Sequence, residues 1–108
     1  MNPLQSPMEI LELAPGESRS FTVLWAEEGR TTITPRDGRP PKEIPVLRLH
    51  VGPQDKPTFP QYYDVTALTL QAQIRPLVMA PGYVARRFTV TKVGSGPQAR
   101  FTLLSNPA

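Results

Sequence analysis

The sequence contains no cysteine, which excludes disulfide frameworks, cysteine-ligated zinc and thiol nucleophiles. Its one histidine, His50, cannot by itself form a histidine-rich metal site. No apolar run approaches the roughly 18 residues of a membrane span, and the start MNPLQSPMEI lacks the charged region and apolar core of a signal peptide. We therefore expect a cytoplasmic protein that has no cofactor and does not enter a membrane.

Long uninterrupted elements are also missing, because 14 prolines and 7 glycines divide the 108 residues into short segments that disfavour long helices. A chain of this length has room for one core. We expect residues 1–10 to form a flexible N-terminal arm and residues 11–105 to form a single β-barrel domain.

Short runs of alternating apolar residues predict strands. Phe21, Val23 and Trp25 fall on one face of the first strand, and Glu27-Glu28-Gly29 should turn the chain into the second. The first three expected strands cover residues 20–25, 30–34 and 44–51. Two proline-rich segments are expected to be loops, residues 35–45 and 52–63.

The only helical pattern lies in residues 64–79, where apolar residues recur at helical spacing. Asp64 or Thr66 can cap the start of this helix through its side-chain oxygen. Pro76 should end or kink the helix, because the residue before a proline avoids the helical conformation.

Residues 86–104, RRFTVTKVGSGPQARFTLL, predict a closing β-hairpin around a Gly-Ser-Gly-Pro turn, and every charge in it is positive. One face of the hairpin should pack on the core. The residues of that face are Phe88, Val90, Phe101 and Leu103. The residues expected to face water are Arg87, Thr89, Thr91, Arg100 and Thr102.

The expected order is strand, strand, strand, helix, strand, strand. With this order the chain resembles the small single-stranded-DNA-binding proteins of phages and prokaryotes that have an OB-fold, a five-stranded Greek-key barrel. The resemblance is carried by LELAPGESRSFTVLW, YYDVTALTLQAQIRPL and FTVTKVGSGPQARFTL. It implies a mostly β fold with one short helix and a DNA-binding, non-catalytic role.

Two features depart from that family pattern. The zinc-binding cysteines of some phage members are missing, and so is a clear acidic C-terminal tail. An immunoglobulin-like β-sandwich is the alternative fold, because PGES followed by a Phe-x-Val strand is similar to the opening of many such modules, although these need about seven strands.

Charge is distributed unevenly along the sequence. Residues 1–28 carry five glutamates against one arginine, whereas no acidic residue follows residue 65. A region of one sign suggests an anionic partner, with chance clustering as the alternative. The cations of this region are Arg75, Arg86, Arg87, Lys92 and Arg100.

Binding of a single nucleic-acid strand needs a basic groove for the phosphates and flat rings on which unpaired bases stack. The predicted phosphate-binding residues are Arg86, Arg87, Lys92 and Arg100 in the hairpin, with Arg36, Arg39, Lys42 and Arg48 before it. The predicted stacking residues are Trp25, Phe59, Tyr62, Tyr63 and Tyr83. Trp25 is either a stacking platform or a core residue, because it shares its strand face with Phe21 and Val23.

These residues predict a non-catalytic nucleic-acid-binding module that favours single-stranded DNA, with a homo-oligomer among its expected assemblies. The alternative is a protein-binding structural or adaptor module, of the kind that phages or mobile elements encode. Such a module would use the aromatic residues of loop 57–63 and an exposed sheet edge.

An enzyme is not expected. His50 has no serine and aspartate context, and Glu9 and Glu12 precede a Pro-Gly turn. The segment Gly94-Ser95-Gly96 lacks the lysine and the following helix of a phosphate-binding loop.

Overall fold

The computed structural model describes residues 2–3 and 7–108. Its strands are β1 (Asn2–Pro3), β2 (Ser18–Ile33), β3 (Lys42–Val51), β4 (Tyr62–Val65), β5 (Arg86–Val93) and β6 (Arg100–Pro107). The helices are α1 (Leu68–Val78) and the single 3-10 turn η1 (Gly96–Gln98). Neither helix of this described part is long and apolar enough to cross a membrane.

All the strands belong to one sheet, in the order β4-β3-β2-β5-β6, with β1 attached to β2. The five main strands pair antiparallel, and β1 pairs parallel. The prediction of a mostly β fold with one short helix is confirmed. Within the described residues the end strands β4 and β6 do not pair, so the sheet is open and the expected closed barrel is not confirmed. A single sheet also differs from the two facing sheets of the immunoglobulin-like alternative.

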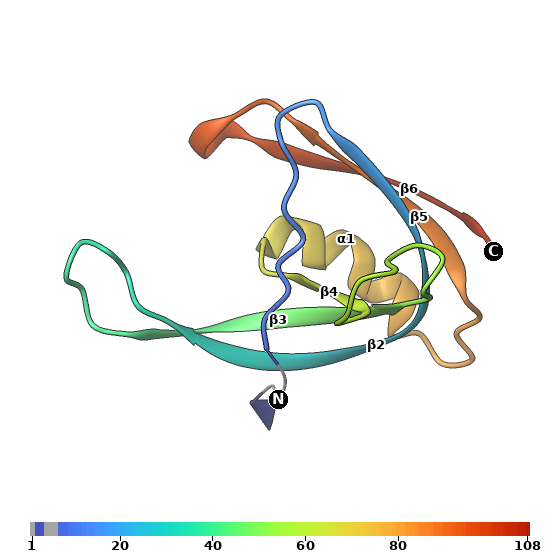
Figure 1. Cartoon of the computed structure of the whole chain (residues 1–108), viewed down its shortest axis with the longest axis horizontal. Coiled ribbons are helices and arrows are strands. Elements are labelled where there is room, and N and C mark those ends of the chain that lie inside the picture. The colour runs from blue at the N-terminus through green and yellow to red at the C-terminus, as the bar shows by residue number, and fades with distance from the viewer. Residues whose placement is uncertain (1, 4–6) are drawn as a thin grey trace.

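Strand β2 is continuous over 16 residues, and the predicted turn at Glu27-Glu28-Gly29 is wrong. Its first part pairs with β5 and its second part with β3, so the sheet curves along β2 (Figure 1). Gly29 is buried opposite Val46. Glu27 contacts the His50 ring and Glu28 forms an ion pair with Arg75, and neither contact needs a turn.

A β-bulge at Leu24 determines the direction of Trp25. In the register between β2 and β3, Val23 is opposite Val51, whereas Trp25 is opposite His50, so β2 carries one extra residue. Because side chains alternate along a strand, the extra residue moves Trp25 to the face opposite to the buried Val23. Trp25 is 52% exposed, and its assignment to the core is wrong.

Helix α1 lies inside the curve of the sheet (Figure 1). The sheet surface toward α1 is called the inner face below, and the opposite surface the outer face. The core on the inner face joins residues of the sheet to the helix residues Leu70, Ile74 and Val78. The fully buried sheet residues of this core include Phe21, Val23, Leu47, Leu49, Phe88 and Val90.

The ends of α1 differ from the prediction. The helix begins at Leu68, and its N-cap, Ala67, makes no side-chain hydrogen bond. Asp64 does not cap the helix, because it lies in β4 with its carboxylate bound to Arg48. The helix continues past Pro76 to Val78, so the proline does not end it; Pro76 has no amide to donate to the carbonyl four residues earlier.

Strand β4 is a second correction, because Tyr62 and Tyr63 were expected in a loop. Four residues form β4, and all four are buried. On the far side of β4, Glu9 accepts a hydrogen bond from the Asp64 amide at 2.7 Å and Leu11 donates one to the Asp64 carbonyl at 2.9 Å. The predicted flexible arm covers residues 1–10; its residues 1 and 4–6 lie outside the described residues.

The closing hairpin forms as predicted. Strands β5 and β6 pair without interruption from the Arg86–Pro107 pair to the Val93–Arg100 pair. Gly94 lies at the turn with φ +82°, a conformation in which glycine has no steric penalty. The predicted core residues of the hairpin are buried or half-buried.

Candidate functional site

An aromatic row crosses the outer face of the sheet. Trp25 of β2 is opposite His50 of β3, and His50 is opposite Tyr62 of β4. The Trp25 and His50 rings are stacked, with centroids 3.8 Å and planes 5° apart. The His50 and Tyr62 rings are tilted by 56° at 5.6 Å. These three residues, with Glu27 and Arg48, are called the aromatic face below.

Trp25 is the accessible member of this row. His50 covers one face of the indole, and the residue as a whole is still 52% exposed. Glu27 holds His50 through a 2.7 Å contact between its Oε2 and the imidazole Nε2. The indole is therefore supported from one side by a fixed ring and can accept a further planar ring on the other.

Tyr62 and Arg48 are covered, in contrast to their predicted contacts with nucleic acid. Arg48 is 2% and Tyr62 7% exposed, and both donate hydrogen bonds to the carbonyl of Pro7. The guanidinium lies 3.9 Å above the Tyr62 ring. It also makes two hydrogen bonds with the Asp64 carboxylate, at 2.7 and 3.0 Å.

The guanidinium of Arg48 keeps its positive charge inside the protein. Burial alone would lower the pKa of Arg48, but the hydrogen bonds and the charge of Asp64 outweigh it, and the pKa is raised. The pair ties β3 to β4 beneath the aromatic row, and it supports the row without being accessible to a ligand.

The loop of residues 52–61 presents a second exposed ring. Phe59 is 90% exposed, while the loop around it is held at two points. The Asp55 carboxylate accepts the Thr22 amide at 3.0 Å and the Arg87 guanidinium at 3.0 Å. The buried Lys56 donates to the Pro60 carbonyl. Phe59 lies in the loop that joins β3 to β4, the two strands that carry His50 and Tyr62.

The other two predicted stacking residues have structural roles. Tyr63 is buried and lies 5.2 Å from the Phe21 ring. The Tyr83 hydroxyl donates to the Val23 carbonyl at 2.6 Å and accepts from the Arg86 amide at 3.1 Å. Burial raises the pKa of Tyr83. The Tyr63 ring is therefore not available to a base, and the hydroxyl of the partly buried Tyr83 is engaged within the fold.

The cations of the closing hairpin do not form one basic face. Antiparallel partners share a face, so Lys92, opposite the half-buried Phe101, and Arg86 point to the inner side. Arg87 and Arg100 lie on the outer side, where Arg87 pairs with Asp55 at 3.0 Å. The four predicted phosphate-binding cations of the hairpin are therefore divided between the two faces of the sheet.

Folding also mixes the charges that the sequence separates. Arg75 forms an ion pair with Glu28 across the inner face, just as Arg87 pairs with Asp55 across the outer face. Glu28 and Asp55 thus pair with cations that follow residue 65. The acid-free region after residue 65 therefore does not become a purely basic surface.

The cations before the hairpin gather on a projecting ribbon. Residues 30–43 extend away from the body of the protein (Figure 1). They comprise the end of β2, the start of β3 and the turn between them, and are called the β2–β3 arm below. Two arm arginines are paired, Arg30 with Glu43 and Arg39 with Asp37. The other cations of the arm are Arg36 and Lys42; both are exposed, and the described residues place no carboxylate in ion-pair range of either.

Groups that could carry out covalent or metal chemistry were sought among the described residues. The Glu27–His50 pair has the geometry of a base and its orienting carboxylate, but no hydroxyl nucleophile is hydrogen-bonded to His50 in the described part of the chain. Residues 2–3 and 7–108 also contain no group of three or more side chains placed to hold a metal ion. What this surface offers a ligand is a flat ring and nearby charge.

His50 and Glu27 are the site residues that sequence reasoning missed. They are far apart in the sequence and meet only through the register of β2 and β3. His50 is a polar residue in a run of strand-forming residues, which also describes an ordinary solvent-facing position, and Glu27 was expected in a turn.

Comparison of the chain with protein-family models, with curated protein sequences and with solved structures gives no match. The function is therefore inferred below from the geometry of the aromatic face and the β2–β3 arm.

Proposed function

We propose that this chain is a non-catalytic module that binds single-stranded nucleic acid, with single-stranded DNA as the first candidate. The observation that carries the proposal is the exposed Trp25 ring, stacked on His50 on the outer face. Every nucleobase has a flat π-face, and stacking on an aromatic side chain contributes about 1–3 kcal/mol per base. A double helix hides these faces, so an exposed ring selects unpaired strands.

The positive charge of the β2–β3 arm also supports the proposal of a nucleic-acid ligand. Arg36 and Lys42 are exposed and outside the ion pairs of the arm. A cation with no carboxylate beside it can neutralise a phosphate without first breaking an ion pair, and release of the condensed counterions then drives binding. The rings supply base contacts, and the arm supplies contacts to the backbone.

The strand order is also compatible with an OB-type module. Pairing of β4 with β6 would close the observed order β4-β3-β2-β5-β6 into a five-stranded barrel, but residues 9–11 are bonded to the far side of β4 and would have to move aside. Barrels of this type bind oligonucleotides on their second and third strands and on adjoining loops. In this chain those strands correspond to β3 and β4, and one of those loops corresponds to the tip of the β2–β3 arm.

A protein-binding adaptor is the second candidate, and one observation favours it. Phe59 is 90% exposed on a loop that Asp55 and Lys56 hold in place. A rigid, exposed aromatic ring is the type of residue that anchors protein interfaces. Tyr62 and Tyr63 do not add to this surface, because both are buried.

Salt dependence separates the two candidates. Labelled single-stranded oligo-dT, the corresponding RNA and a duplex of equal length would be titrated with the protein at two salt concentrations. We expect binding of the single strands that weakens steeply with salt and a lower affinity for the duplex. Equal affinity for the duplex, or no binding at low salt, would reject the proposal and leave the adaptor as the remaining candidate.

A further inference from the structure

Strand β6 is an end strand whose outer edge has no strand beside it. It runs for eight residues with an unbroken register and carries one charged residue, Arg100, at its start. Edge strands that are long, regular and weakly charged can pair with another strand, and proteins usually blunt them with bulges, charges or proline. Here Pro107 blunts the far end of the edge, and at the near end Gln73 of α1 contacts Phe101.

The hydrogen-bond pattern between β5 and β6 identifies the backbone groups of β6 that point away from β5, beyond the edge of the sheet; these groups are called outward below. Lys92 of β5 accepts a hydrogen bond from Gly16 at 2.8 Å and donates one to Glu17 at 3.0 Å, so its backbone groups point toward β2. Phe101, opposite Lys92, therefore directs its own amide and carbonyl away from β5. By the alternation of the ladder, Leu103 and Ser105 do the same.

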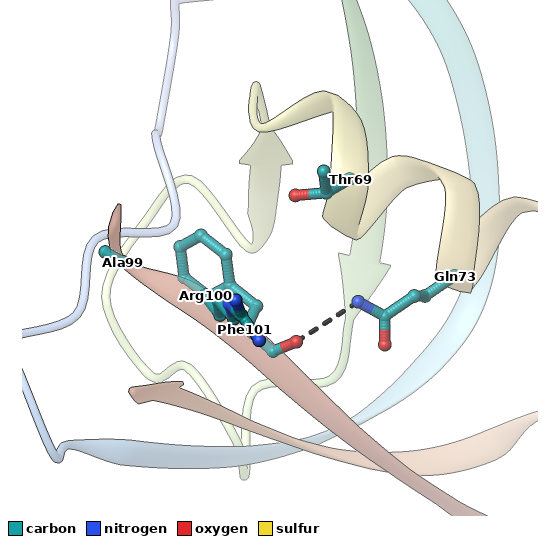
Figure 2. A pocket seen from close by; sticks show the side chains of 5 residues that line it. All are labelled: Thr69, Gln73, Ala99, Arg100 and Phe101. Carbon is teal, nitrogen blue, oxygen red and sulfur yellow. Dashed lines mark hydrogen bonds between the residues drawn. The ribbon is translucent and has the colours of Figure 1, made fainter. Parts of the chain in front are cut away.

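Two of the three outward carbonyls already accept a side-chain donor. Gln73 reaches from α1 to the Phe101 carbonyl at 3.1 Å (Figure 2), and Arg86 reaches the Ser105 carbonyl at 3.4 Å. Each carbonyl has two lone pairs, so both can accept a second bond. In the described part of the chain no partner is found for the Leu103 carbonyl or for the outward amides of all three residues.

We propose that β6 pairs antiparallel with β6 of a second copy of this chain, about a two-fold axis at Leu103. The residues with outward groups are placed symmetrically about Leu103. The outward amides of each copy can therefore donate to the outward carbonyls of the other. Leu103 then exchanges both hydrogen bonds with its own counterpart, and Phe101 exchanges them with Ser105. Arg100 falls opposite Asn106, so no like charges meet across the new pair. The proposal does not depend on nucleic-acid binding.

A pocket at the end of β6 supports this register. It has a volume of about 270 Å³ and is lined by Thr69, Gln73, Ala99, Arg100 and Phe101 (Figure 2). The register that pairs Leu103 with itself places Pro107 of the second copy opposite Ala99. The incoming end of the strand would thus lie beside the pocket, where there is space for the proline ring.

The molar mass in solution tests the pairing with two variants of one residue. Ser105→Ala and Ser105→Pro both remove the 2.8 Å hydrogen bond between the Arg86 guanidinium and the serine hydroxyl, but only proline removes the outward amide. Proline is tolerated on an edge where the amide faces solvent. Light scattering over a concentration series should show a concentration-dependent dimer for the wild type and Ser105→Ala, and a folded monomer for Ser105→Pro. A wild-type monomer at all concentrations, or an unchanged Ser105→Pro dimer, would overturn the proposal.

Cross-linking provides a second test if Ser105→Pro does not fold. The sequence has no cysteine, so introduced cysteines are unique. The register places Thr102 opposite Leu104 of the second copy, in a pair with Cα atoms about 4.5 Å apart, which is within disulfide range. A mixture of Thr102→Cys and Leu104→Cys should oxidise mainly to the mixed dimer. Equal yields of the three possible disulfides, or none, would contradict this register.

Discussion

Trp25 and His50 lie face to face across β2 and β3, with ring planes only 5° apart. The bulge at Leu24 inserts one residue into β2 and so places Trp25 on the outer face, where His50 of β3 also lies. Without the bulge, alternation would direct the indole into the core. The same irregularity thus removes a large apolar ring from the interior and presents it to solvent, next to the fixed imidazole of His50.

Replacement of Trp25 by alanine should weaken single-strand binding and leave the fold intact. Loss of one stacked base corresponds to about 1–3 kcal/mol, and a half-exposed ring contributes little to the core. Leu24→Ala is the matched control, because Leu24 adjoins Trp25 and has almost the same exposure, 50% against 52%. Fluorescence anisotropy of a labelled oligonucleotide would measure both variants. Equal losses for Leu24→Ala and Trp25→Ala would argue against a stacking role.

The two unpaired cations of the arm should contribute through phosphates. The double variant Arg36→Gln/Lys42→Gln should weaken binding similarly for all base sequences and reduce the salt slope by about 1.4, at about 0.7 per phosphate for single strands. Arg39→Gln is the control, since Arg39 is engaged with Asp37 at 2.7 Å. Oligonucleotides of about 4 and about 16 nucleotides, the range for one OB fold, would locate the contacts. An unchanged salt slope with the longer strand would exclude the arm from the interface.

The buried pair beneath the aromatic face should dominate stability. Asp64→Asn leaves the guanidinium of Arg48 buried without its counter-charge, and breaking such a pair costs about 3–5 kcal/mol. Asp37→Asn breaks an exposed pair, with side chains 78% and 52% exposed, and should cost less than about 1 kcal/mol. Urea denaturation measures both free energies of unfolding. Similar values for the two variants would mean that Arg48 is satisfied by other partners.

Tyr83 should make the free energy of unfolding depend on pH in the alkaline range. Burial raises its pKa in the folded protein above the ordinary value of 10.0, so the folded state holds this proton more tightly than the unfolded state. The contribution of the protonated Tyr83 hydroxyl to the free energy of unfolding is complete below pH 10. It is lost as the pH rises through the pKa of Tyr83 in the folded protein. Tyr83→Phe removes the hydroxyl and its two hydrogen bonds, at a cost of about 1–3 kcal/mol at neutral pH.

Urea denaturation of both proteins between neutral and alkaline pH would measure the effect. The difference in unfolding free energy between wild type and Tyr83→Phe should shrink above pH 10. A constant difference across that range would show that Tyr83 does not titrate with folding.

Local patterns predicted the parts of the fold that depend on local physics. The closing hairpin was predictable, because alternation and a glycine turn specify two half-buried strands without reference to the rest of the chain. The strand over residues 44–51 was also found, and β3 begins only slightly earlier. The helix was predicted in the right place, but its start was set too early because Asp64 resembled a cap.

The candidate site could be predicted only in part, because it depends on register. Trp25, Phe59 and the cations of the arm were identified by type, since an exposed ring and a basic loop are local features. The bulge that exposes Trp25 and the pairing that brings Glu27 to His50 arise between strands. Charge was misjudged for the same reason: Asp55 lies far from Arg87 in the sequence and neutralises it in the fold.

The fluorescence of Trp25 tests the central claim most directly, because the sequence contains a single tryptophan and its emission reports on the proposed platform alone. Titration with single-stranded oligo-dT at low salt should quench this emission saturably, and added salt should reverse the effect. The midpoint should match that of anisotropy with the same oligonucleotide. Unchanged tryptophan emission while anisotropy reports saturation would show that the strand binds elsewhere and would contradict the account.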